Sequence, residues 1–242
     1  MLAEKIRDAK SVVIFTGAGM STESGLPDFR SSHGVWQNVN PSEVATIEAL
    51  NNNVTQFFEF YRTRVLGVRE YQPNQGHYIL AKWANEGLVS TIITQNVDGF
   101  HTAAGAPEVL ELHGTLRTVH CQTCGKKYSN VMYEKQTYYC QCGGTLRPSV
   151  VLFGEFLDEH VMFKATVKSE KSTIFIVLGS SLTVSPANYF PELAKQHGAY
   201  LVIVNAEPTP LDAIADEVIQ HERIGAFLTR MDEEITQLRK QR

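Results

Sequence analysis

The stretch SVVIFTGAG at residues 11–19 decides the fold of this 242-residue chain. Its first six residues are almost entirely apolar, which is typical of a strand buried on both faces of a parallel sheet. Gly17 and Gly19 follow at once, and Ser21 begins a polar segment that can start a helix. A strand, a glycine turn and a helix in this order let backbone N–H groups approach a phosphate, so the stretch favours nucleotide binding over a simple tight turn.

The rest of the chain alternates in the same way between apolar runs and helical patterns, which predicts an α/β fold with a parallel sheet covered on both faces. Residues 33–41 are predicted as a loop, with Gly34 and Pro41 as breakers, and Gly87 is a plausible helix end. We predict helices at residues 2–10, 41–50, 54–68, 75–86, 158–168, 187–197 and 224–239, and strands at 11–16, 88–94, 108–112, 149–153, 173–178 and 200–204.

Five of the predicted strands end in polar residues or glycine. Ligands of open α/β sheets bind beyond the carboxyl ends of the strands, so we expect these clusters to meet at one edge and to form a cleft. The clusters are Gly17-Ala18-Gly19, Gln95-Asn96-Val97-Asp98, His113-Gly114, Gly179-Ser180-Ser181 and Asn205.

The glycine turn is not a complete dinucleotide fingerprint. Thr22 stands where G-x-G-x-x-G has its third glycine, and the acidic residue that usually binds the ribose about 20 residues further on is missing. Asn205 and Glu207, after the strand at 200–204, could hold a ribose instead. A simple turn pair explains these two residues equally well at this stage.

Composition and charge describe an ordinary globular protein, with 43% hydrophobic and 20% charged residues. The formal net charge of -4 disfavours nucleic acid as a partner, because nucleic-acid binders carry a basic surplus. The N-terminus lacks the apolar core of a signal peptide, and no run approaches the roughly 20 apolar residues of a membrane helix. We expect a soluble, cytoplasmic protein.

All four cysteines lie in one short segment, as a C-x-x-C pair (Cys121, Cys124) and a C-x-C pair (Cys140, Cys142). Two close thiolate pairs suit tetrahedral zinc, and four protein ligands leave no open position, so we predict a structural zinc ion. The metal would also explain how residues 117–147, which show little periodicity, fold without a large core of their own. Free thiols or a redox pair are the alternatives.

Two longer motifs resemble those of the sirtuin family. Residues 17–30, GAGMSTESGLPDFR, are similar to the signature G-A-G-I-S-x-x-S-G-I-P-D-F-R, and residues 94–101, TQNVDGFH, to T-Q-N-I-D-x-L-H. The resemblance covers about residues 5–230 and is to bacterial-type members that consist of the core alone. Met20, the serines of residues 179–181 and the C-x-C pair depart from the family pattern without removing a base, hydroxyl or ligand. The later motifs follow in the family's order: His113-Gly114, the four cysteines, Phe153-Gly154-Glu155, Gly179-Ser180-Ser181-Leu182 and Asn205.

The resemblance implies a Rossmann-like, doubly wound parallel sheet in a large domain, and a small domain made of a zinc ribbon and a helical module. We assign residues 1–32, 73–116 and 148–242 to the large domain and residues 33–72 and 117–147 to the small one. A substrate peptide is expected in the groove between them, as an added strand. The expected pairing segments contain Val151, Phe153, Gly154 and Glu155 on one side and follow Leu182 on the other.

The resemblance also implies an NAD-dependent protein-lysine deacylase. The acyl-lysine oxygen attacks C1′ of the nicotinamide ribose, nicotinamide leaves, and His113 acts as general base on the ribose hydroxyls. The 2′-hydroxyl then takes up the acyl group, so the products are free lysine, nicotinamide and 2′-O-acyl-ADP-ribose. A histidine suits this role because its pKa lies near neutrality.

The motifs imply a role for each matching residue. Asn96 and Asp98 would hold the nicotinamide and its ribose beside His113, Gln95 would bond the ribose, and Phe29 would cover it. Without the motifs, strand-end polar residues are usually helix caps, and a lone histidine is usually structural. The other expected NAD contacts are Gly17, Ala18, Gly19, Thr22, Arg30, Val97, Gly179, Ser180, Ser181, Asn205, Glu207 and Ile224.

The acyl group is less determined. Tyr61 and Arg64 lie at i, i+3 on a predicted helix and resemble the tyrosine–arginine pair of sirtuins that remove succinyl and malonyl groups. The short distance from this pair to Pro73-Asn74 favours a plain surface pair, so deacetylation is the default. Two other functions stay open: a mono-ADP-ribosyltransferase on the same scaffold, and a non-catalytic NAD sensor or zinc-ribbon module. The intact His113 favours deacylation over both.

Overall fold

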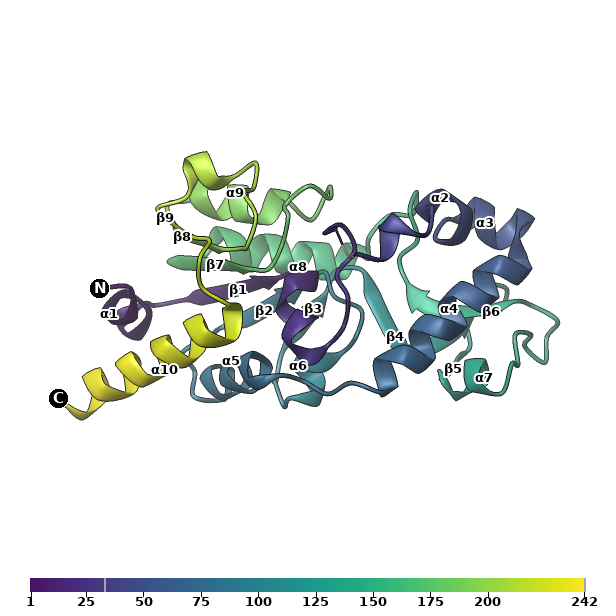
Figure 1. Ribbon diagram of the computed structural model, residues 1–242, viewed down its shortest axis with the longest axis horizontal. Helices are drawn as coiled ribbons and strands as arrows, with labels where there is room; N and C mark the ends of the chain where they lie inside the picture. The colour runs from purple at the N-terminus through teal and green to yellow at the C-terminus, as the bar shows by residue number, and fades with distance from the viewer. Residues whose placement is uncertain (33, 242) are drawn as a thin grey trace.

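The computed structural model describes residues 1–32 and 34–241, and its centre is a six-stranded sheet (Figure 1). All neighbouring strands are parallel, in the order β3-β2-β1-β7-β8-β9. This is the strand order of a doubly wound Rossmann sheet, in which the winding reverses between β1 and β7. The strands are β1 (Val12–Thr16), β2 (Thr91–Thr94), β3 (Val109–Glu111), β7 (Ile174–Leu178), β8 (Tyr200–Val204) and β9 (Glu217–Ile219).

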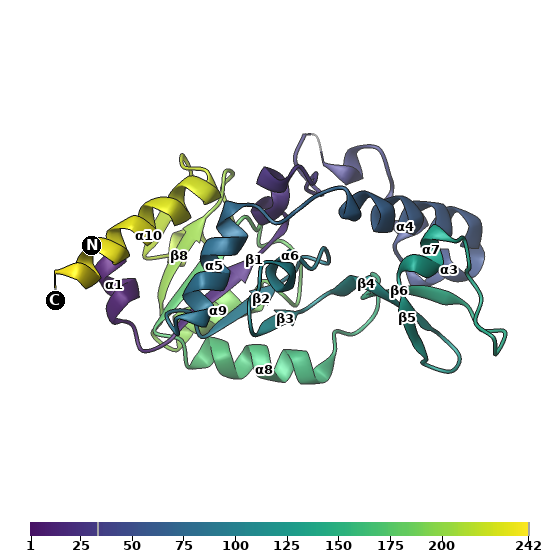
Figure 2. The same ribbon diagram turned by 90° about the horizontal axis from the view of Figure 1, so that it is seen from below.

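Helices cover both faces of this sheet (Figure 2). One face is covered by α1 (Leu2–Asp8), α5 (Gln75–Asn85) and α10 (Ile224–Lys240), and the other by α8 (Glu159–Glu170) and α9 (Tyr189–Gln196). Alternation along β1 sends Ile14 into the first layer, and Val13 and Phe15 into the second. Both faces of the central strands are buried, which is why their sequences are unbroken apolar runs.

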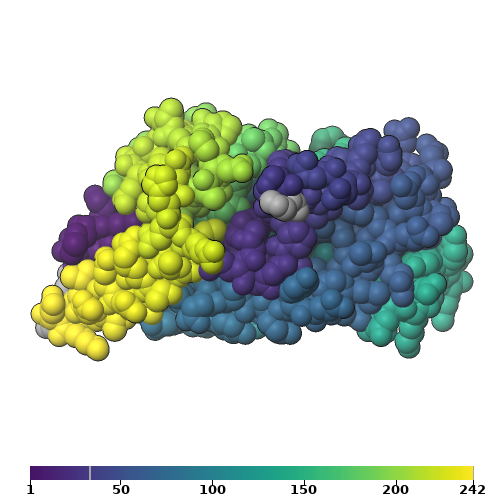
Figure 3. All heavy atoms as spheres, in the orientation of Figure 1, coloured from purple at the N-terminus to yellow at the C-terminus, as the bar shows by residue number. Residues whose placement is uncertain are grey.

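A second, antiparallel sheet and a group of helices form the other end of the molecule. β4 (Gly114–Cys121) lies between β5 (Lys127–Ser129) and β6 (Leu146–Val150), and α7 (Val131–Glu134) follows β5. The helical module consists of α2 (Pro41–Val44), α3 (Ile47–Asn52) and α4 (Val54–Arg69). Phe57 and Phe58 of α4 share one core with Val119 and Tyr133 of the ribbon. In the space-filling view, the segment that follows β1 lies between this end and the C-terminal part (Figure 3).

The predicted strand at residues 149–153 is wrong both in its bounds and in the strand with which it pairs. The strand there is β6, which begins at Leu146 and pairs antiparallel with β4 instead of joining the parallel sheet. Beyond it the chain is held by single hydrogen bonds, from Val151 N to His113 O and from Phe153 N to Ala45 O, both 2.9 Å. The run is apolar because Val150 and Leu152 enter the core shared with α4.

Three other local predictions need correction. The predicted helix at 41–50 is two helices, because Thr46 Oγ1 caps α3 by accepting from Ala49 N at 2.9 Å. The helix after the glycine turn is a 3-10 helix, Ala18–Ser24, that starts directly after Gly17. The predicted loop contains a short 3-10 helix, Val35–Gln37, and its residue 33 lies outside the described residues. Strands β4 and β9 were not predicted, because neither forms an apolar run.

The fold class is confirmed: a doubly wound parallel sheet with a small second part built from a cysteine-bearing ribbon and a helical module. The boundaries predicted at 116/117 and 147/148 fall inside β4 and β6, and the division into domains stays a prediction. Within residues 1–32 and 34–241, none of the helices combines the length and the apolar character that a bilayer crossing requires.

Candidate functional site

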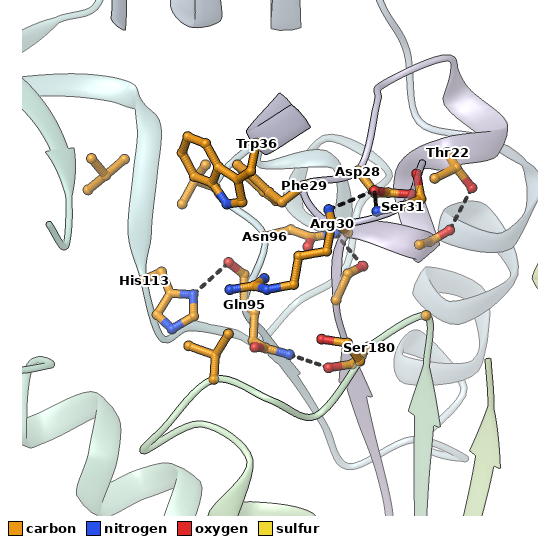
Figure 4. A pocket seen from close by; sticks show the side chains of 18 of the residues that line it. Thr22, Asp28, Phe29, Arg30, Ser31, Trp36, Gln95, Asn96, His113 and Ser180 are labelled. Carbon is orange, nitrogen blue, oxygen red and sulfur yellow. Dashed lines mark hydrogen bonds between the residues drawn. The ribbon is translucent and has the colours of Figure 1, made fainter. Parts of the chain in front are cut away.

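The strand ends meet as expected, and a cavity of about 670 Å³ lies beside them (Figure 4). It extends to the helical module, because Phe60 of α4 lines it as well. Every residue predicted to bind NAD or substrate lines this cavity, with Asp98 as the exception. They are Gly17, Ala18, Gly19, Thr22, Phe29, Arg30, Tyr61, Arg64, Gln95, Asn96, Val97, His113, Val151, Phe153, Gly154, Glu155, Gly179, Ser180, Ser181, Asn205, Glu207 and Ile224.

Two glycine turns form the innermost wall of the cavity. Gly19 N donates to Gly179 O at 2.9 Å, which joins the turn after β1 to the turn after β7. A Cβ at position 17 would lie 2.6 Å from Gly179 O, and a Cβ at position 19 would lie 2.7 Å from Gly179 Cα. Side chains are therefore excluded between the two turns, and backbone forms this part of the wall.

His113 stands at the end of β3 with one ring nitrogen fixed. Its Nδ1 lies 3.0 Å from the carbonyl oxygen of Gln95, and because a carbonyl can only accept, Nδ1 carries the hydrogen. The other nitrogen, Nε2, is thereby left as a proton acceptor in the cavity wall. Burial lowers the pKa of His113, the hydrogen bond to Gln95 opposes this shift, and Arg30 adds to it. His113 is therefore neutral at pH 7, which is the form that a general base needs.

Asn96 and Asp98 are joined through Ser21. Asn96 Nδ2 donates to Gly17 O at 3.0 Å and to Ser21 Oγ at 3.2 Å, and Ser21 Oγ donates to Asp98 Oδ2 at 2.8 Å. Asp98 also accepts from Phe100 N at 2.9 Å, at the first residue of α6 (Phe100–Ala103), whose N-cap residue is Gly99. Ser21, which the sequence reading took only as part of a helix start, is buried at the centre of this group.

Asp98 lines a second cavity of about 530 Å³ instead of the first. The two cavities share Phe29, Phe60 and Arg64, and Asn96 lines both. Burial raises the pKa of Asp98, while hydrogen bonds from Phe100 N and Ser21 and the charge of Arg64 oppose the rise. Asn96 therefore connects the larger cavity to the buried carboxyl group through Ser21.

The polar side of the larger cavity is held by side chains from two strands. Gln95 Nε2 donates to Ser180 Oγ at 2.7 Å, which ties the end of β2 to the end of β7 across β1. Arg30 extends into the cavity on the side of His113 and Gln95 (Figure 4). Its guanidinium adds a cation to this wall, beside the two glycine turns.

Aromatic side chains form the opposite wall, and the expectation of a surface pair at Tyr61 and Arg64 is wrong. Tyr61 is 5% exposed, and the guanidinium carbon of Arg64 lies 4.7 Å from the ring centroid of Phe29. Trp36 packs against Phe29 with its ring tilted, at a centroid distance of 5.2 Å. The sequence reading missed Trp36, because a single aromatic residue in a predicted loop carries no periodic signal.

At the far end, Asn205 and Glu207 both form a turn and line the cavity. Asn205 Nδ2 donates to Glu207 O at 2.7 Å. Ile224 lines the cavity at the first turn of α10, and Glu23 Oε1 accepts from Gly225 N at 2.9 Å. Arg223, the N-cap residue, makes no side-chain cap, so Glu23 serves α10 as a cap from the other end of the chain. No sequence pattern pointed to this contact.

The four cysteines form a second site, away from the cavity. Their sulfur atoms all lie within 4.8 Å of one another, with Cys121 and Cys142 at 3.5 Å and Cys124 and Cys140 at 3.7 Å. Zinc–sulfur bonds of about 2.3 Å place the sulfurs of a tetrahedral site about 3.8 Å apart, so the cluster fits zinc closely. Four thiolates would fill all the positions of a tetrahedral zinc ion and leave none for water or substrate, so the ion would have a structural role.

The comparisons with known proteins agree with this geometry. A sequence model of the Sir2 family matches residues 17–186. The chain belongs to the Sir2 family, the sirtuins. It is 56% identical over 235 residues to an NAD-dependent protein deacetylase of Oceanobacillus iheyensis, and the alignment covers 97% of this chain and 100% of that protein. It is 42% identical over 245 residues to an NAD-dependent protein deacetylase of Sulfolobus acidocaldarius, covering 99% and 96%.

Solved Sir2 structures share the whole fold. A complex of Sir2 with a p53 peptide and NAD+ has a TM-score of 0.86 at 34% identity, covering 96% of each chain. A complex of Sir2 with an inhibitor, 2′-O-acetyl-ADP-ribose and a deacetylated p53 peptide has a TM-score of 0.87 at 34% identity, covering 96% of this chain and 97% of that one. The resemblance found in the sequence motifs is thus confirmed at the level of the family.

Removing one thiolate should release the metal. We expect Cys121→Ser to lose zinc and to melt at a lower temperature than the parent protein. Among the described residues, the apolar cluster around Cys121 is small, with Cys140 and Leu146 buried and Tyr128 and Met132 partly buried against them. Metal analysis of the purified variant and its thermal melting curve test this. A Ser→Ala change at Ser129, which lies on β5 outside the cluster, is the matched control. Full zinc content in Cys121→Ser would contradict the assignment.

Proposed function

We propose that this protein is an NAD-dependent protein-lysine deacetylase. The proposal is carried by the position of His113, which is fixed through Nδ1 while Nε2 stays free at the edge of a cavity large enough for a dinucleotide. The two relatives described above, both NAD-dependent protein deacetylases, support the activity. The Sir2 complexes with peptide, NAD+ and 2′-O-acetyl-ADP-ribose support the same ligands here.

The cavity divides into regions that suit the parts of NAD. Asn205 and Glu207 offer polar groups for the adenosine ribose, and Ile224 offers an apolar edge for adenine. The glycine turns, Ser180 and Ser181 suit the two phosphates, where Arg30 supplies positive charge. Asn96, which lines both cavities, and Asp98, in the second, are placed for the nicotinamide end.

His113 then has a defined task. NAD supplies an electrophilic ribose carbon and a leaving nicotinamide, and the acyl oxygen of the substrate lysine is the nucleophile. His113 Nε2 takes the proton from a ribose hydroxyl, and the Gln95 carbonyl stabilises the cationic ring that results through Nδ1–H. Phe29 and Trp36 keep water from the reacting carbon, because they close the apolar side of the cavity.

The peptide is proposed to enter between residues 151–155 and 183–186. Val151, Phe153, Gly154 and Glu155 line the cavity on one side, and residues 184–186 line it on the other. Glu155 is fixed by Arg147, with oxygen–nitrogen distances of 2.9 and 2.7 Å, so the first segment is held rigid. A rigid backbone edge beside an apolar cavity suits strand addition by an extended acyl-lysine peptide.

Loss of the base should remove catalysis and leave binding. We expect His113→Ala to lower kcat by about 100-fold or more, with the Kd for NAD and the melting temperature near those of the parent. His120→Ala, a histidine of β4 outside the cavity, is the matched control. Turnover is measured by mass spectrometry of an acetyl-lysine peptide, and NAD binding by calorimetry.

The pH profile tests the same base. The pKa of His113 lies below its usual value of 6.5, so the neutral, active form persists at pH 7 and is lost only as the pH falls through the lowered pKa. We expect kcat/KM to be flat above pH 7 and to fall tenfold per pH unit well below 6.5. If kcat/KM has already fallen to its acidic minimum at pH 7.5, His113 is not the base.

Glu23 should matter for NAD affinity. Without its carboxyl group the first turn of α10 loses its cap, and Ile224 loses its fixed position. We expect Glu23→Ala to raise the KM for NAD by roughly fivefold, the equivalent of a cap worth about 1 kcal/mol, with kcat within twofold. Glu23→Gln keeps an acceptor for Gly225 N and should restore most of the affinity. Equal KM values in parent and Glu23→Ala would refute the role.

A wider deacylase activity is the second candidate, and Arg64 is the observation that favours it. No carboxylate among the described residues lies within ion-pair distance of Arg64, a partly exposed residue that lines the cavity. Burial raises the pKa of the neighbouring Tyr61 to about 12, so its hydroxyl group stays protonated and able to donate. Both groups suit an acyl chain that ends in a carboxylate.

A panel of acetyl-, succinyl- and myristoyl-lysine peptides, with and without NAD, separates the candidates. We expect NAD-dependent loss of acetyl together with 2′-O-acetyl-ADP-ribose. If succinyl is removed as well, Arg64→Met should abolish that activity and keep deacetylation within about threefold. NAD consumption with ADP-ribose on protein, and no free lysine, would replace the proposal by a mono-ADP-ribosyltransferase.

A further inference from the structure

Two histidines lie side by side outside the lining of the cavity, and the proposed reaction uses neither. His77 in α5 and His101 in α6 have ring centroids 4.8 Å apart, and their relative exposures are 0% and 2%. Figure 2 shows α5 and α6 as neighbours on the same face of the sheet. Each ring has one nitrogen with a hydrogen-bond partner and one without: His77 Nε2 and His101 Nδ1 have none among the described residues.

The partner of His77 fixes its tautomer. Its Nδ1 accepts from the backbone N–H of Asn74 at 3.2 Å, as part of the capping box of α5. A nitrogen that accepts from an N–H carries no hydrogen, so in the neutral ring the hydrogen is on Nε2. His77 therefore presents a buried donor.

The hydrogen-bond partner of His101 makes the free nitrogen of this ring an acceptor. Its Nε2 lies 3.0 Å from Thr16 Oγ1, and that hydroxyl donates its own hydrogen to Thr94 Oγ1 at 2.7 Å. Thr16 Oγ1 must then accept, so the hydrogen of His101 is on Nε2 and its Nδ1 is an acceptor. The free atoms of the two rings are thus a donor and an acceptor, and leaving both unpaired in the interior would be costly.

We propose that His77 and His101 are a neutral donor–acceptor pair that positions the carboxyl ends of β1 and β2. From His101 the hydrogen bonds continue through Thr16 and Thr94 to Asn96 N, which bonds Thr94 Oγ1 at 3.0 Å. That peptide also carries the Gln95 carbonyl to which His113 is bonded.

The other end of the pair reaches the glycine turn. Asn74, which donates to His77 Nδ1 through its backbone, donates through Nδ2 to Met20 O at 2.8 Å. Met20 lies in the 3-10 helix directly after that turn. His77 and His101 therefore act as positioning residues: they connect two walls of the cavity without touching it, since neither residue lines it.

The pair stays neutral because nothing nearby favours a charge. Burial lowers the pKa of His77 to about 4, and burial together with the neighbouring His77 holds the pKa of His101 well below its usual value. Among the described residues, the hydrogen-bond and ring partners of the two imidazoles are Asn74, Thr16 and Phe100, and none of these side chains carries a charge.

The test removes the two unpartnered ring nitrogens and keeps the outer bonds. An asparagine oxygen can replace Nδ1, and a glutamine amide can replace Nε2–H. His77→Asn therefore keeps the bond from Asn74 N and vacates the position of the Nε2 donor, because asparagine is too short to reach it. His101→Gln keeps the bond to Thr16 and vacates the position of the Nδ1 acceptor. Each single variant leaves one of the two ring atoms without the other, and the double variant removes both.

We expect each single variant to melt several degrees lower, and the double variant to melt no lower than the worse of the two. We also expect kcat for acetyl-peptide turnover to fall about tenfold in each single variant, because the Gln95–Asn96 peptide that holds His113 shifts. The KM for NAD should stay within twofold, because both variants keep the bond from Asn74 N and with it the link to the glycine turn. His197→Gln, at the end of α9, combined with His77→Asn is the control in which losses should add.

Nitrogen NMR of the imidazole rings gives the tautomers directly, with the two variants supplying the assignments. Nε2–H on both rings at pH 7 is the expected result, and Nδ1–H on either ring would overturn the pair. Additive melting losses would also overturn it. Coupled melting with unchanged kcat would overturn the positioning role. This inference rests on the proposed deacetylase function for its kinetic readout alone. If the protein lacked that activity, NMR and the melting temperatures would still show whether the two histidines form the pair.

Discussion

The rest of the structure depends on the contact between the turns that follow β1 and β7. Gly17 and Gly19 approach Gly179 so closely that a Cβ at either position would lie within 2.7 Å of backbone atoms. Gly17 is necessary because its backbone approaches Gly179 too closely for a side chain. Its backbone conformation does not require glycine, since a φ of -122° is open to any residue. The winding of the sheet reverses at this same pair of strands, so the chain departs to opposite faces and leaves a crevice where backbone forms the wall.

The polar residues at this edge have their hydrogen bonds within the protein. Asn96 bonds Gly17 O and Ser21, Gln95 bonds Ser180, and Asp98 accepts from Ser21 and Phe100 N. Buried polar groups in this state are rigid, and in a low dielectric each bond is stronger than it would be in water. One cause, burial, raises the pKa of Asp98 and lowers the pKa of His113, so both groups move toward their neutral forms. The site is thus ordered before any ligand arrives.

The sequence was informative where one residue type satisfies one physical demand. Apolar runs such as residues 200–204 marked the central strands, and strand ends marked the cavity, because both follow from the geometry of a parallel sheet. The sequence was uninformative about contacts that only the folded chain creates. Glu23 bonds Gly225 N, 202 positions away, at the start of α10. Val150 and Leu152 are apolar because they enter the core shared with α4, and not because they belong to the parallel sheet. Tyr61 and Arg64 looked like a surface pair because helix periodicity cannot tell a solvent face from a cavity face.

The two sites are mechanically connected through α4. One face of this helix packs with Phe57, Phe58 and Val65 into the core that the ribbon completes, and Arg69 at its end bonds Glu134 at 2.6 Å and Asn130. The same helix carries Phe60, Tyr61 and Arg64 into the cavity wall. The ribbon contributes few apolar side chains of its own, so its shape is set by the four thiolates and what they bind. The acyl side of the cavity can therefore be no more ordered than the metal site, although the two share no residue.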